Sequence, residues 1–185
     1  MKLNRTPLLG LVVVEPTVFE DKRGYFFESY HAKKLAELGI DVDFVQDNQS
    51  FSKQGTIRGL HYQTAPYAQT TLVRVIQGEV WDVAVDLRPG TKTFGKWEGV
   101  KLSADNKKQL LIPKGFAHGF AVLSQQAIVL YKCDAFYFRE AEQGIVFNDP
   151  TLAIDWQLDA QEITVSEKDR QLPTFQEKFR NPTHA

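Results

Sequence analysis

Apolar and polar positions alternate in short runs along most of the chain, and this period of two predicts β-strands. Such runs occupy residues 8–14, 25–29, 44–47, 56–62, 72–76, 80–87, 96–102, 109–112, 117–123, 128–134 and 144–147. Turn-forming residues separate them, as at Gln77-Gly78, Asp105-Asn106 and Pro113-Lys-Gly115. Regularly spaced short strands are typical of a β-sandwich or barrel. We therefore expect an all-β fold for one domain over residues 1–185.

Helical periodicity is confined to short segments near the two ends. Residues 31–38 have an apolar stripe at Leu35 and Leu38, and Gly39 predicts the end of that helix. Ser166 predicts the start of another helix near the C-terminus. Residues 19–24 have the composition of a turn. The fold is thus expected to contain few and short helices.

The run at residues 80–87 has two unlike faces. Its odd positions, from Trp81 to Leu87, are entirely apolar, whereas the other face carries Asp82 and Asp86. Acids on one face of a strand usually point to solvent, which is the simpler expectation. In a barrel with a functional lumen they would instead point inward and hydrogen-bond a cation or a histidine.

Composition and charge exclude several classes of protein. Hydrophobic residues make up 43% and charged residues 24% of the chain, as in an ordinary water-soluble globular protein. The net charge of −1 gives no indication of a nucleic-acid or acidic-membrane partner. No apolar run approaches the roughly 20 residues of a membrane span, and no secretion signal opens the sequence. A single cysteine, Cys133, fits a reducing compartment, so we expect a cytoplasmic protein.

Residues 55–63 carry the most unusual combination in the chain. Arg58 and His61 stand three positions apart in a strand-like run, and regular alternation would place them on opposite faces. Gly59, between them, could form a β-bulge that brings both to one face. We expect the wall of a barrel whose inner face does polar chemistry.

Two of the four histidines are candidates for chemistry. His31 lies in the first helix and His184 in the tail, where neither has an evident role. His61 and His118 lie in strands rich in glycine and aromatic residues. The run Pro113-x-Gly115-x-x-His118 resembles the cupin barrel, in which such a turn feeds a strand that points its histidine into the lumen.

Metal binding is not favoured by these histidines. Metal-binding cupins carry His-x-His plus a glutamate, but here Tyr62 and Gln63 follow His61, so a third ligand is missing. There is no dinucleotide fingerprint and no P-loop, so we expect no cofactor and no metal. Nucleophilic catalysis also lacks its usual signature. Proton transfer by a histidine remains.

Seven segments resemble dTDP-4-dehydrorhamnose 3,5-epimerases, a family of cofactor-free, cupin-type nucleotide-sugar epimerases. In chain order they are Phe19-x-Asp21-x-Arg23-Gly24-x-Phe26-x-Glu28, Gln46-Asp47-Asn48-x-Ser50, Arg58-Gly59-Leu60-His61-Tyr62-Gln63, Asp82-Val-Ala-Val-Asp86-Leu-Arg88, Pro113-x-Gly115-Phe-Ala-His118-Gly119-Phe120, Leu130-Tyr131-Lys132 and Asn148-Asp149-Pro150. The similarity spans about residues 8–169. It implies a cupin-like antiparallel β-barrel, or jelly roll, and 3,5-epimerisation of dTDP-4-dehydro-6-deoxy-D-glucose to dTDP-4-dehydro-L-rhamnose.

The resemblance also implies roles for individual residues. His61 would be the base, Asp169 its carboxylate partner and Tyr131 the acid on the opposite face, with Arg58 and His118 beside the developing oxyanion. The positions that would bind the rest of the dTDP-4-keto-6-deoxy sugar are Arg23, Glu28, Gln46, Asp47, Asn48, Glu142 and Lys168. The family further implies a homodimer, in which Arg23 and Glu28 would serve the neighbouring subunit's site.

Simpler interpretations exist for these residues. Asp169 fits a capping box after Ser166, Tyr131 fits a core position, and charged residues are usually solvated surface. The chain also departs from the family at Thr71, where the family has a lysine that faces the enolate oxygen. The alternatives are therefore an epimerase acting at one centre of a related 4-keto nucleotide sugar, an inactive nucleotide-sugar-binding protein, and, more remotely, a metal-dependent cupin.

Overall fold

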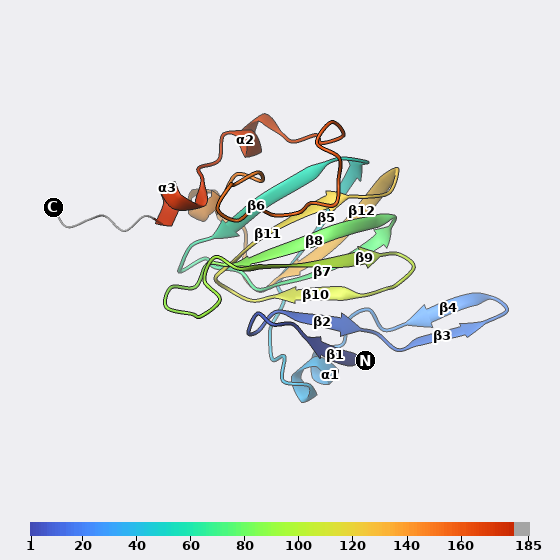
Figure 1. Cartoon of the computed structure of the whole chain (residues 1–185). Helices are drawn as coiled ribbons and strands as arrows, with labels where there is room; N and C mark the ends of the chain where they lie inside the picture. Colours follow the sequence, from blue (N-terminus) through green and yellow to red (C-terminus); the bar gives the residue numbers. More distant parts are fainter. Residues whose placement is uncertain (180–185) are drawn as a thin grey trace.

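Two antiparallel β-sheets face each other in the computed structural model, which describes residues 1–179 (Figure 1). In spatial order, the six-stranded sheet contains β1 (Lys2–Arg5), β2 (Val12–Glu15), β10 (Gln109–Ile112), β7 (Thr71–Gln77), β12 (Gln126–Cys133) and β5 (Gln46–Lys53). The five-stranded sheet contains β13 (Glu142–Gly144), β6 (Ile57–Gln63), β11 (Phe116–Val122), β8 (Glu79–Asp86) and β9 (Trp97–Ser103). This arrangement confirms the predicted all-β, cupin-like jelly roll. His184 lies outside the described residues.

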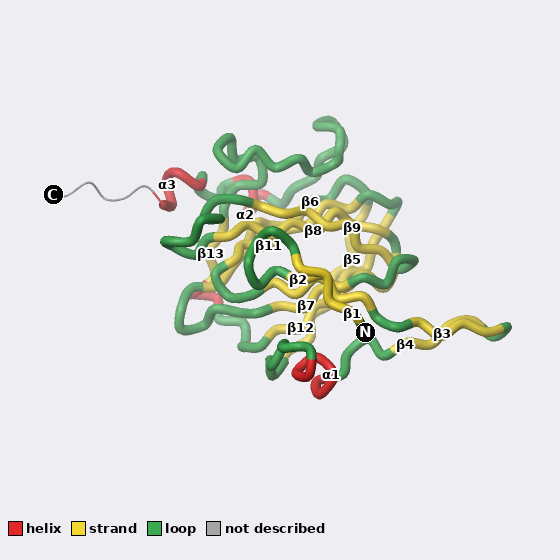
Figure 2. Tube along the Cα trace, turned by 60° about the horizontal axis from the view of Figure 1, so that its bottom comes forward, coloured by secondary structure: helices red, strands yellow, loops and turns green. Residues whose placement is uncertain are grey.

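A two-stranded hairpin and short helical segments complete the described chain. The hairpin consists of β3 (Val18–Asp21) and β4 (Gly24–Phe27), and it projects away from the two sheets (Figures 1 and 2). The helical segments are α1 (Ala32–Glu37), η1 (Arg139–Ala141), α2 (Glu167–Arg170) and α3 (Phe175–Phe179). No helix in this part of the chain is both long and apolar enough to cross a membrane.

The two predicted helix starts and the first helix end are confirmed. The His31 side chain accepts a hydrogen bond from the backbone of Lys34 and so caps α1, which gives this histidine a structural role. Gly39, with a φ of +88°, follows the end of α1. Ser166 caps α2 in the same way as His31 caps α1.

The main core fills the space between the two sheets at one end. Val73, Val75 and Val129 point into it from the six-stranded sheet and are almost fully buried. Ala84 and Phe120 meet them from the five-stranded sheet. Each fully buried side chain of this size stabilises the fold by about 1.5–3 kcal/mol relative to an exposed one.

Each sheet is also covered on its outer face. The segment after β13 crosses the outside of the five-stranded sheet, where Trp156 and Leu152 pack against Val83 and Val85 (Figure 1). On the other side, Leu35 of α1 packs in a cluster with residues from the six-stranded sheet. The covered outer faces explain why the odd positions of β8 are wholly apolar.

The solvent-facing expectation for the acids of β8 is wrong. Asp82 and Asp86 are both 0% exposed, because the face of β8 that carries them is the inner one. Asp86 is satisfied by Arg88, which binds both of its carboxylate oxygens, at 2.8 and 2.7 Å. Asp82 pairs with His118.

Some predicted strand boundaries also differ from the structure. The run 8–14 forms a strand only from Val12, because Gly10 adopts a φ of +90° in a turn. The run 44–47 begins too early and ends too soon, since β5 extends from Gln46 to Lys53. Its polar sequence hides the strand, because one of its faces lines a cavity rather than the core.

Candidate active site

A cavity of about 700 Å³ lies between the open ends of the two sheets. Its walls come from β5, β7 and β12 on one side and from β6 and β11 on the other, with α2 and its preceding residues along the rim. The predicted site residues among its lining are Gln46, Asn48, Arg58, His61, His118, Tyr131, Glu142, Lys168 and Asp169. Residues far apart in the sequence therefore meet here.

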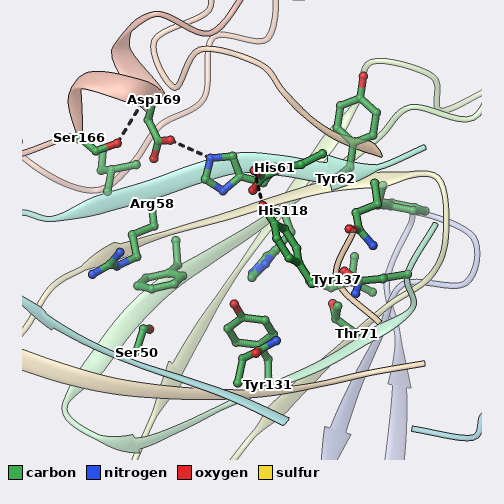
Figure 3. Close-up of a pocket in the computed structure, with 18 of the residues that line it drawn as sticks. Ser50, Arg58, His61, Tyr62, Thr71, His118, Tyr131, Tyr137, Ser166 and Asp169 are labelled. Atoms are coloured by element: carbon green, nitrogen blue, oxygen red, sulfur yellow. Dashed lines mark hydrogen bonds and ion pairs between the residues drawn. The ribbon is translucent and has the colours of Figure 1, made fainter. Parts of the chain in front are cut away.

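A bulge in β6 places Arg58 and His61 in this cavity together. His61 stands opposite His118 and Arg58 opposite Phe120, so β6 uses three steps where β11 uses two. The extra residue reverses the alternation between Arg58 and His61, and both side chains line the cavity (Figure 3). The predicted effect of a bulge at this point is confirmed.

Glycine is required at the bulge for a steric reason. A Cβ atom on Gly59 would lie 2.6 Å from the Cα of Gly119 and 2.6 Å from the carbonyl oxygen of His118. Its φ of +116° is also a conformation that other residues rarely adopt. A side chain at Gly59 would therefore push apart the two strands that carry the histidines.

His61 forms a close pair with Asp169 of α2. Its Nε2 lies 2.8 Å from Oδ1 of Asp169, and the carboxylate is almost fully buried (Figure 3). Burial acts to raise the pKa of Asp169, but the hydrogen bond and charge of His61 outweigh it, so that the pKa lies below its ordinary value. An ionised Asp169 fixes the proton of the imidazole on Nε2 and leaves the lone pair on Nδ1.

Asp169 also occupies the capping position that the sequence suggested. It is the third residue of α2, and its backbone N–H donates to Oγ of Ser166 at 3.1 Å. The Gly59 N–H donates to the other carboxylate oxygen at 3.3 Å. The helix start thus holds the carboxylate in place for His61, so the structural and functional interpretations of Asp169 are compatible.

His118 is held by a second carboxylate. Its Nε2 lies 2.9 and 3.0 Å from the two oxygens of Asp82, which is fully buried. Burial raises the pKa of Asp82, and His118 partly offsets that rise. The pair leaves the other edge of the imidazole toward the cavity. Asp82 was not named as a site residue, although its place on the acidic face of β8 was a usable signal.

Tyr131 lies on the opposite wall. It belongs to β12, and Figure 3 shows its ring across the cavity from His61. Burial raises the pKa of Tyr131 and Cys133 adds to the rise, whereas the charge of Arg58 opposes it. Tyr131 therefore keeps its proton at neutral pH. His61 and Tyr131, the two side chains that can transfer a proton, thus come from different sheets.

Arg58 and Thr71 lie on either side of Tyr131 in Figure 3. Arg58 is tethered by its Nε, which donates to Oγ of Ser52 at 2.9 Å. Thr71 begins β7, beside Cys133, and its side chain lines the cavity. At this position the wall therefore presents a neutral hydroxyl group.

A cluster of polar side chains lies at the rim of the cavity. Lys168 contacts Glu142 at 2.5 Å, and the Tyr137 hydroxyl donates to the same carboxylate at 3.0 Å. Burial would raise the pKa of Glu142, but the hydrogen bonds from Lys168 and Tyr137 lower it. Gln46 and Asn48 reach the cavity from alternate positions of β5. The rim therefore offers an ion pair, an aromatic ring and two amides.

Three of the predicted binding residues are not brought to this cavity. Arg23 lies in the turn of the projecting hairpin, where it pairs with Asp21 at 2.6 Å. Glu28 pairs with Lys34 near α1. Asp47 lies on the outer face of β5 and binds Lys132 at 2.9 Å, because alternation sends it away from Gln46 and Asn48. Within one chain, these residues do not line the site.

Sequence reasoning left out other lining residues. Ser50 continues the inward face of β5, and its buried Oγ has no hydrogen-bond partner among residues 1–179. Gln63 and Gln69 line the cavity as well. The alternation of polar residues along β5 would have identified Ser50, and the same alternation in β6 would have placed Gln63 on the face of His61, whereas nothing in the sequence pattern singles out Gln69.

No group of three or more histidine, cysteine, aspartate or glutamate side chains within residues 1–179 is arranged to hold a metal ion. His61 and His118 each have a carboxylate partner instead, Asp169 and Asp82.

Comparison with known proteins gives consistent matches over nearly the whole chain. The family model described as dTDP-4-dehydrorhamnose 3,5-epimerase matches residues 5–177. A protein of that name from Pseudomonas aeruginosa is 53% identical over 176 residues, covering 95% of this chain and 96% of its relative.

Two solved structures are similar in both sequence and fold. The crystal structure of dTDP-4-dehydrorhamnose 3,5-epimerase from Elizabethkingia anophelis is 53% identical, with a TM-score of 0.92 over 96% of this chain and 98% of that one. A 3,5-epimerase from Legionella pneumophila, solved with dTDP-4-keto-L-rhamnose, is 50% identical, with a TM-score of 0.89 over 94% of this chain and 92% of that one. The chain belongs to the dTDP-4-dehydrorhamnose 3,5-epimerase family.

Proposed function

We propose that this protein converts dTDP-4-dehydro-6-deoxy-D-glucose to dTDP-4-dehydro-L-rhamnose by inverting C3 and C5. The observation that carries the proposal is the placement of His61 and Tyr131 in one cavity, on walls formed by different sheets. Inversion at a carbon needs a proton removed from one face and another delivered to the opposite face. A base and an acid on facing walls meet that requirement.

His61 is the base in this mechanism. Both C3 and C5 lie next to the C4 ketone, so the protons they carry are acidic enough for an imidazole to remove. Nδ1 of His61 accepts the proton, because Asp169 holds the hydrogen on Nε2. The resulting imidazolium is stabilised by the ionised Asp169. The electron pair of the broken C–H bond moves into the ring, and the ketone becomes an enolate.

Arg58 and His118 stabilise the enolate. Arg58 brings a permanent positive charge into the cavity. His118, oriented by the buried Asp82, directs its remaining ring edge toward the sugar. Preorganised donors of this kind are worth about 10²–10³ in rate each.

Tyr131 completes each inversion. Its hydroxyl gives a proton to the opposite face of the carbanion carbon, and the ketone re-forms. The high pKa of Tyr131, raised by burial, keeps the phenol protonated before this step. His61 then passes its proton to solvent and Tyr131 recovers one, so that the cycle is balanced. The same two residues act at the second carbon.

The nucleotide binds at the rim. Gln46, Asn48, Glu142 and Lys168 supply hydrogen bonds and charge there. Tyr137 supplies an aromatic face for the base. This assignment leaves Arg23, Glu28 and Asp47 without a role in their own chain's cavity.

A homodimer gives the hairpin residues a role. The aromatic side chains of the hairpin are strongly exposed, Phe19 at 62% and Phe26 at 66%, and an isolated two-stranded hairpin is only marginally stable. A second copy of the chain would cover these rings and receive Arg23 and Glu28 near its own rim. We further assign residues 1–185 to one domain and the protein to the cytoplasm, where a free Cys133 stays reduced.

The test is to incubate the protein with dTDP-4-dehydro-6-deoxy-D-glucose in D₂O and follow C3 and C5 by NMR. Deuterium at both carbons with an L-rhamno product is expected. Label at one carbon alone would favour the second candidate function, a single-centre epimerase. The neutral hydroxyl group of Thr71 in the cavity wall is the observation that favours testing it. Binding without any label would leave an inactive sugar-nucleotide-binding protein.

A further inference from the structure

Four successive residues at the rim, 135–138, are held by glutamine side chains, and we call them the rim segment. The segment joins β12 to η1 and carries the exposed rings of Phe136, Tyr137 and Phe138. Tyr137 lines the cavity while being 51% exposed. The position of this segment therefore determines the shape of the cavity entrance.

Gln63 forms two hydrogen bonds with the rim segment. Its Nε2 donates to the carbonyl oxygens of Tyr67 at 2.8 Å and Phe136 at 3.3 Å. Its Oε1 accepts from the backbone N–H of Phe138 at 2.6 Å. Gln63 is only 7% exposed, so these bonds are made where solvent does not replace them easily. One amide thus joins the rim segment to the loop that holds Tyr67.

Two further glutamines each hold one more backbone group of the rim segment. Gln69 donates through Nε2 to the carbonyl oxygen of Ala135 at 2.7 Å. The backbone N–H of Tyr137 donates to Oε1 of Gln46 at 3.0 Å. The rings of Tyr67 and Phe138 also stack, with centroids 4.0 Å apart. Side-chain amides from β6, from β5 and from Gln69, just before β7, therefore replace the ladder that a strand would have supplied.

The place of Gln63 in β6 connects the rim with the catalytic base. Gln63 follows His61 by two residues, which corresponds to about 7 Å along a strand. It also stands opposite Glu142 of β13, whose carboxylate accepts from the Tyr137 hydroxyl. The same strand thus carries the base and the anchor of the rim.

We infer that Gln63 is a positioning residue: it fixes the rim segment at a set distance from His61, so that a nucleotide held at the rim presents its sugar to the base. This inference rests on the proposed function. Gln63 bonds the backbone of Phe136 and Phe138, the residues on either side of Tyr137, so it acts through the rim segment. Its loss should weaken binding of the non-reacting part of the substrate and leave the proton-transfer residues in place.

The main variant is Gln63→Met, which keeps the approximate volume and removes the amide. Gln54→Met is the matched control, because the exposed side chain of Gln54 donates to the Leu123 carbonyl and lies outside the cavity lining. Hydrogen exchange of the unliganded proteins is measured first by mass spectrometry. Faster exchange of peptides covering residues 134–141 is expected in Gln63→Met alone, and unchanged exchange there would overturn the inference.

Binding and turnover are measured next. For Gln63→Met we expect the Kd for dTDP and the KM for the nucleotide sugar to rise about tenfold, with kcat within about twofold of wild type. A fall in kcat at unchanged KM would overturn the positioning role, because it would place Gln63 in the chemical step. The exchange and dTDP measurements need no turnover, so they judge Gln63 separately even if the wild-type protein fails to epimerise the sugar.

A second variant, Gln69→Leu, tests the same inference in case Gln63→Met does not fold. Gln69→Leu removes the single bond to Ala135 from a less buried position. It should change exchange and KM in the same direction by a smaller factor. If Gln63→Met does not fold, an unaltered rim segment in Gln69→Leu would overturn the glutamine anchoring.

Discussion

His61 and Tyr131 face one cavity from two different sheets, His61 from β6 and Tyr131 from β12. This relationship separates proton removal from proton delivery in space, because the substrate ring must lie between the two walls. It also makes the two half-reactions separable by mutation. Loss of the acid should leave the base able to act, whereas loss of the base should stop both steps.

Tyr131→Phe should uncouple exchange from inversion. His61 can still remove the proton and return deuterium from the same face, while delivery from the other face is lost. We expect the epimerised product to form about 10²–10⁴-fold more slowly, with deuterium still entering unreacted substrate. NMR in D₂O measures both quantities in one sample. Tyr30→Phe is the control, because Tyr30 packs outside the cavity beside Phe44 and Lys132.

Asp169→Asn should impair the base while leaving the cavity almost unchanged in shape. The neutral amide no longer selects the hydrogen on Nε2 of His61 and no longer stabilises the imidazolium. We expect kcat to fall by about 10²–10⁴ with KM little changed. Asp155→Asn is the matched control, since this exposed acid lies outside the cavity lining and its carboxylate bonds Gln157. Equal kinetics for the two variants would contradict the role of Asp169.

Local patterns predict much of this fold and less of its site. Alternation located the strands of the core, because one of their faces packs on apolar residues, but it missed most of β5, whose inner face is polar. The bulge at Gly59 could be predicted because Arg58 and His61, three positions apart, would otherwise lie on opposite faces of the strand. The pairing of His61 with Asp169 joins residues 108 positions apart, and no local rule predicts such a contact.

The acids of β8 show a different limit. The sequence offered solvent and lumen as the two environments for Asp82 and Asp86, and the structure places both inside. Composition of a single strand cannot decide between them, because the outer face of β8 is covered by a segment that comes much later in the chain. The decision depends on the packing of Trp156 and its neighbours over Val83 and Val85.

Asp86 should make stability depend on acidity. Although burial raises the pKa of Asp86, hydrogen bonds from Arg88 and Thr93 lower it from 3.8 to about 2. The unfolded chain therefore binds the proton more tightly, and roughly 2 kcal/mol of stability, present above pH 3.8, is lost as pH falls through about 2.

Urea unfolding between pH 5, about one unit above the window, and pH 2, at its lower edge, measures this effect. Asp86→Asn should be less stable at neutral pH and should lose less stability on acidification than wild type. Asp159→Asn is the control, because Asp159 is exposed. A wild-type and an Asp86→Asn curve that fall in parallel would show that Asp86 contributes nothing to the acid limb.

Mixed subunits test whether the hairpin serves a neighbouring site. Arg23→Ala removes the cation at the hairpin turn, and His61→Asn removes the base from the cavity. If the hairpin crosses to the partner, a hybrid dimer contains one site with both residues intact, so an equal mixture should recover roughly a quarter of wild-type activity. Activity no greater than the mean of the two separate variants would show that the hairpin does not contribute to the partner's site. Light scattering gives the oligomeric state of each sample.

The family resemblance implies a lysine where this chain has Thr71, and on that basis Thr71→Lys should raise kcat. The negative charge of the enolate develops on the oxygen of the former ketone, and a charge-assisted hydrogen bond is about twice as strong as a neutral one. Thr71 lines the cavity near Tyr131, so a lysine there would put an ammonium group where the side chain of residue 71 now offers a hydroxyl group (Figure 3).

The expected gain from Thr71→Lys is up to about 10² in kcat, somewhat below the loss caused when an oxyanion donor is removed. Thr71→Met controls for chain length without charge and should not raise kcat. An unchanged or lower rate in Thr71→Lys would mean that Arg58 and His118 already stabilise the enolate fully. In that case Thr71 would not account for a reaction at one carbon alone. Deuterium labelling at C3 and C5 in Thr71→Lys would distinguish epimerisation at one carbon from epimerisation at both.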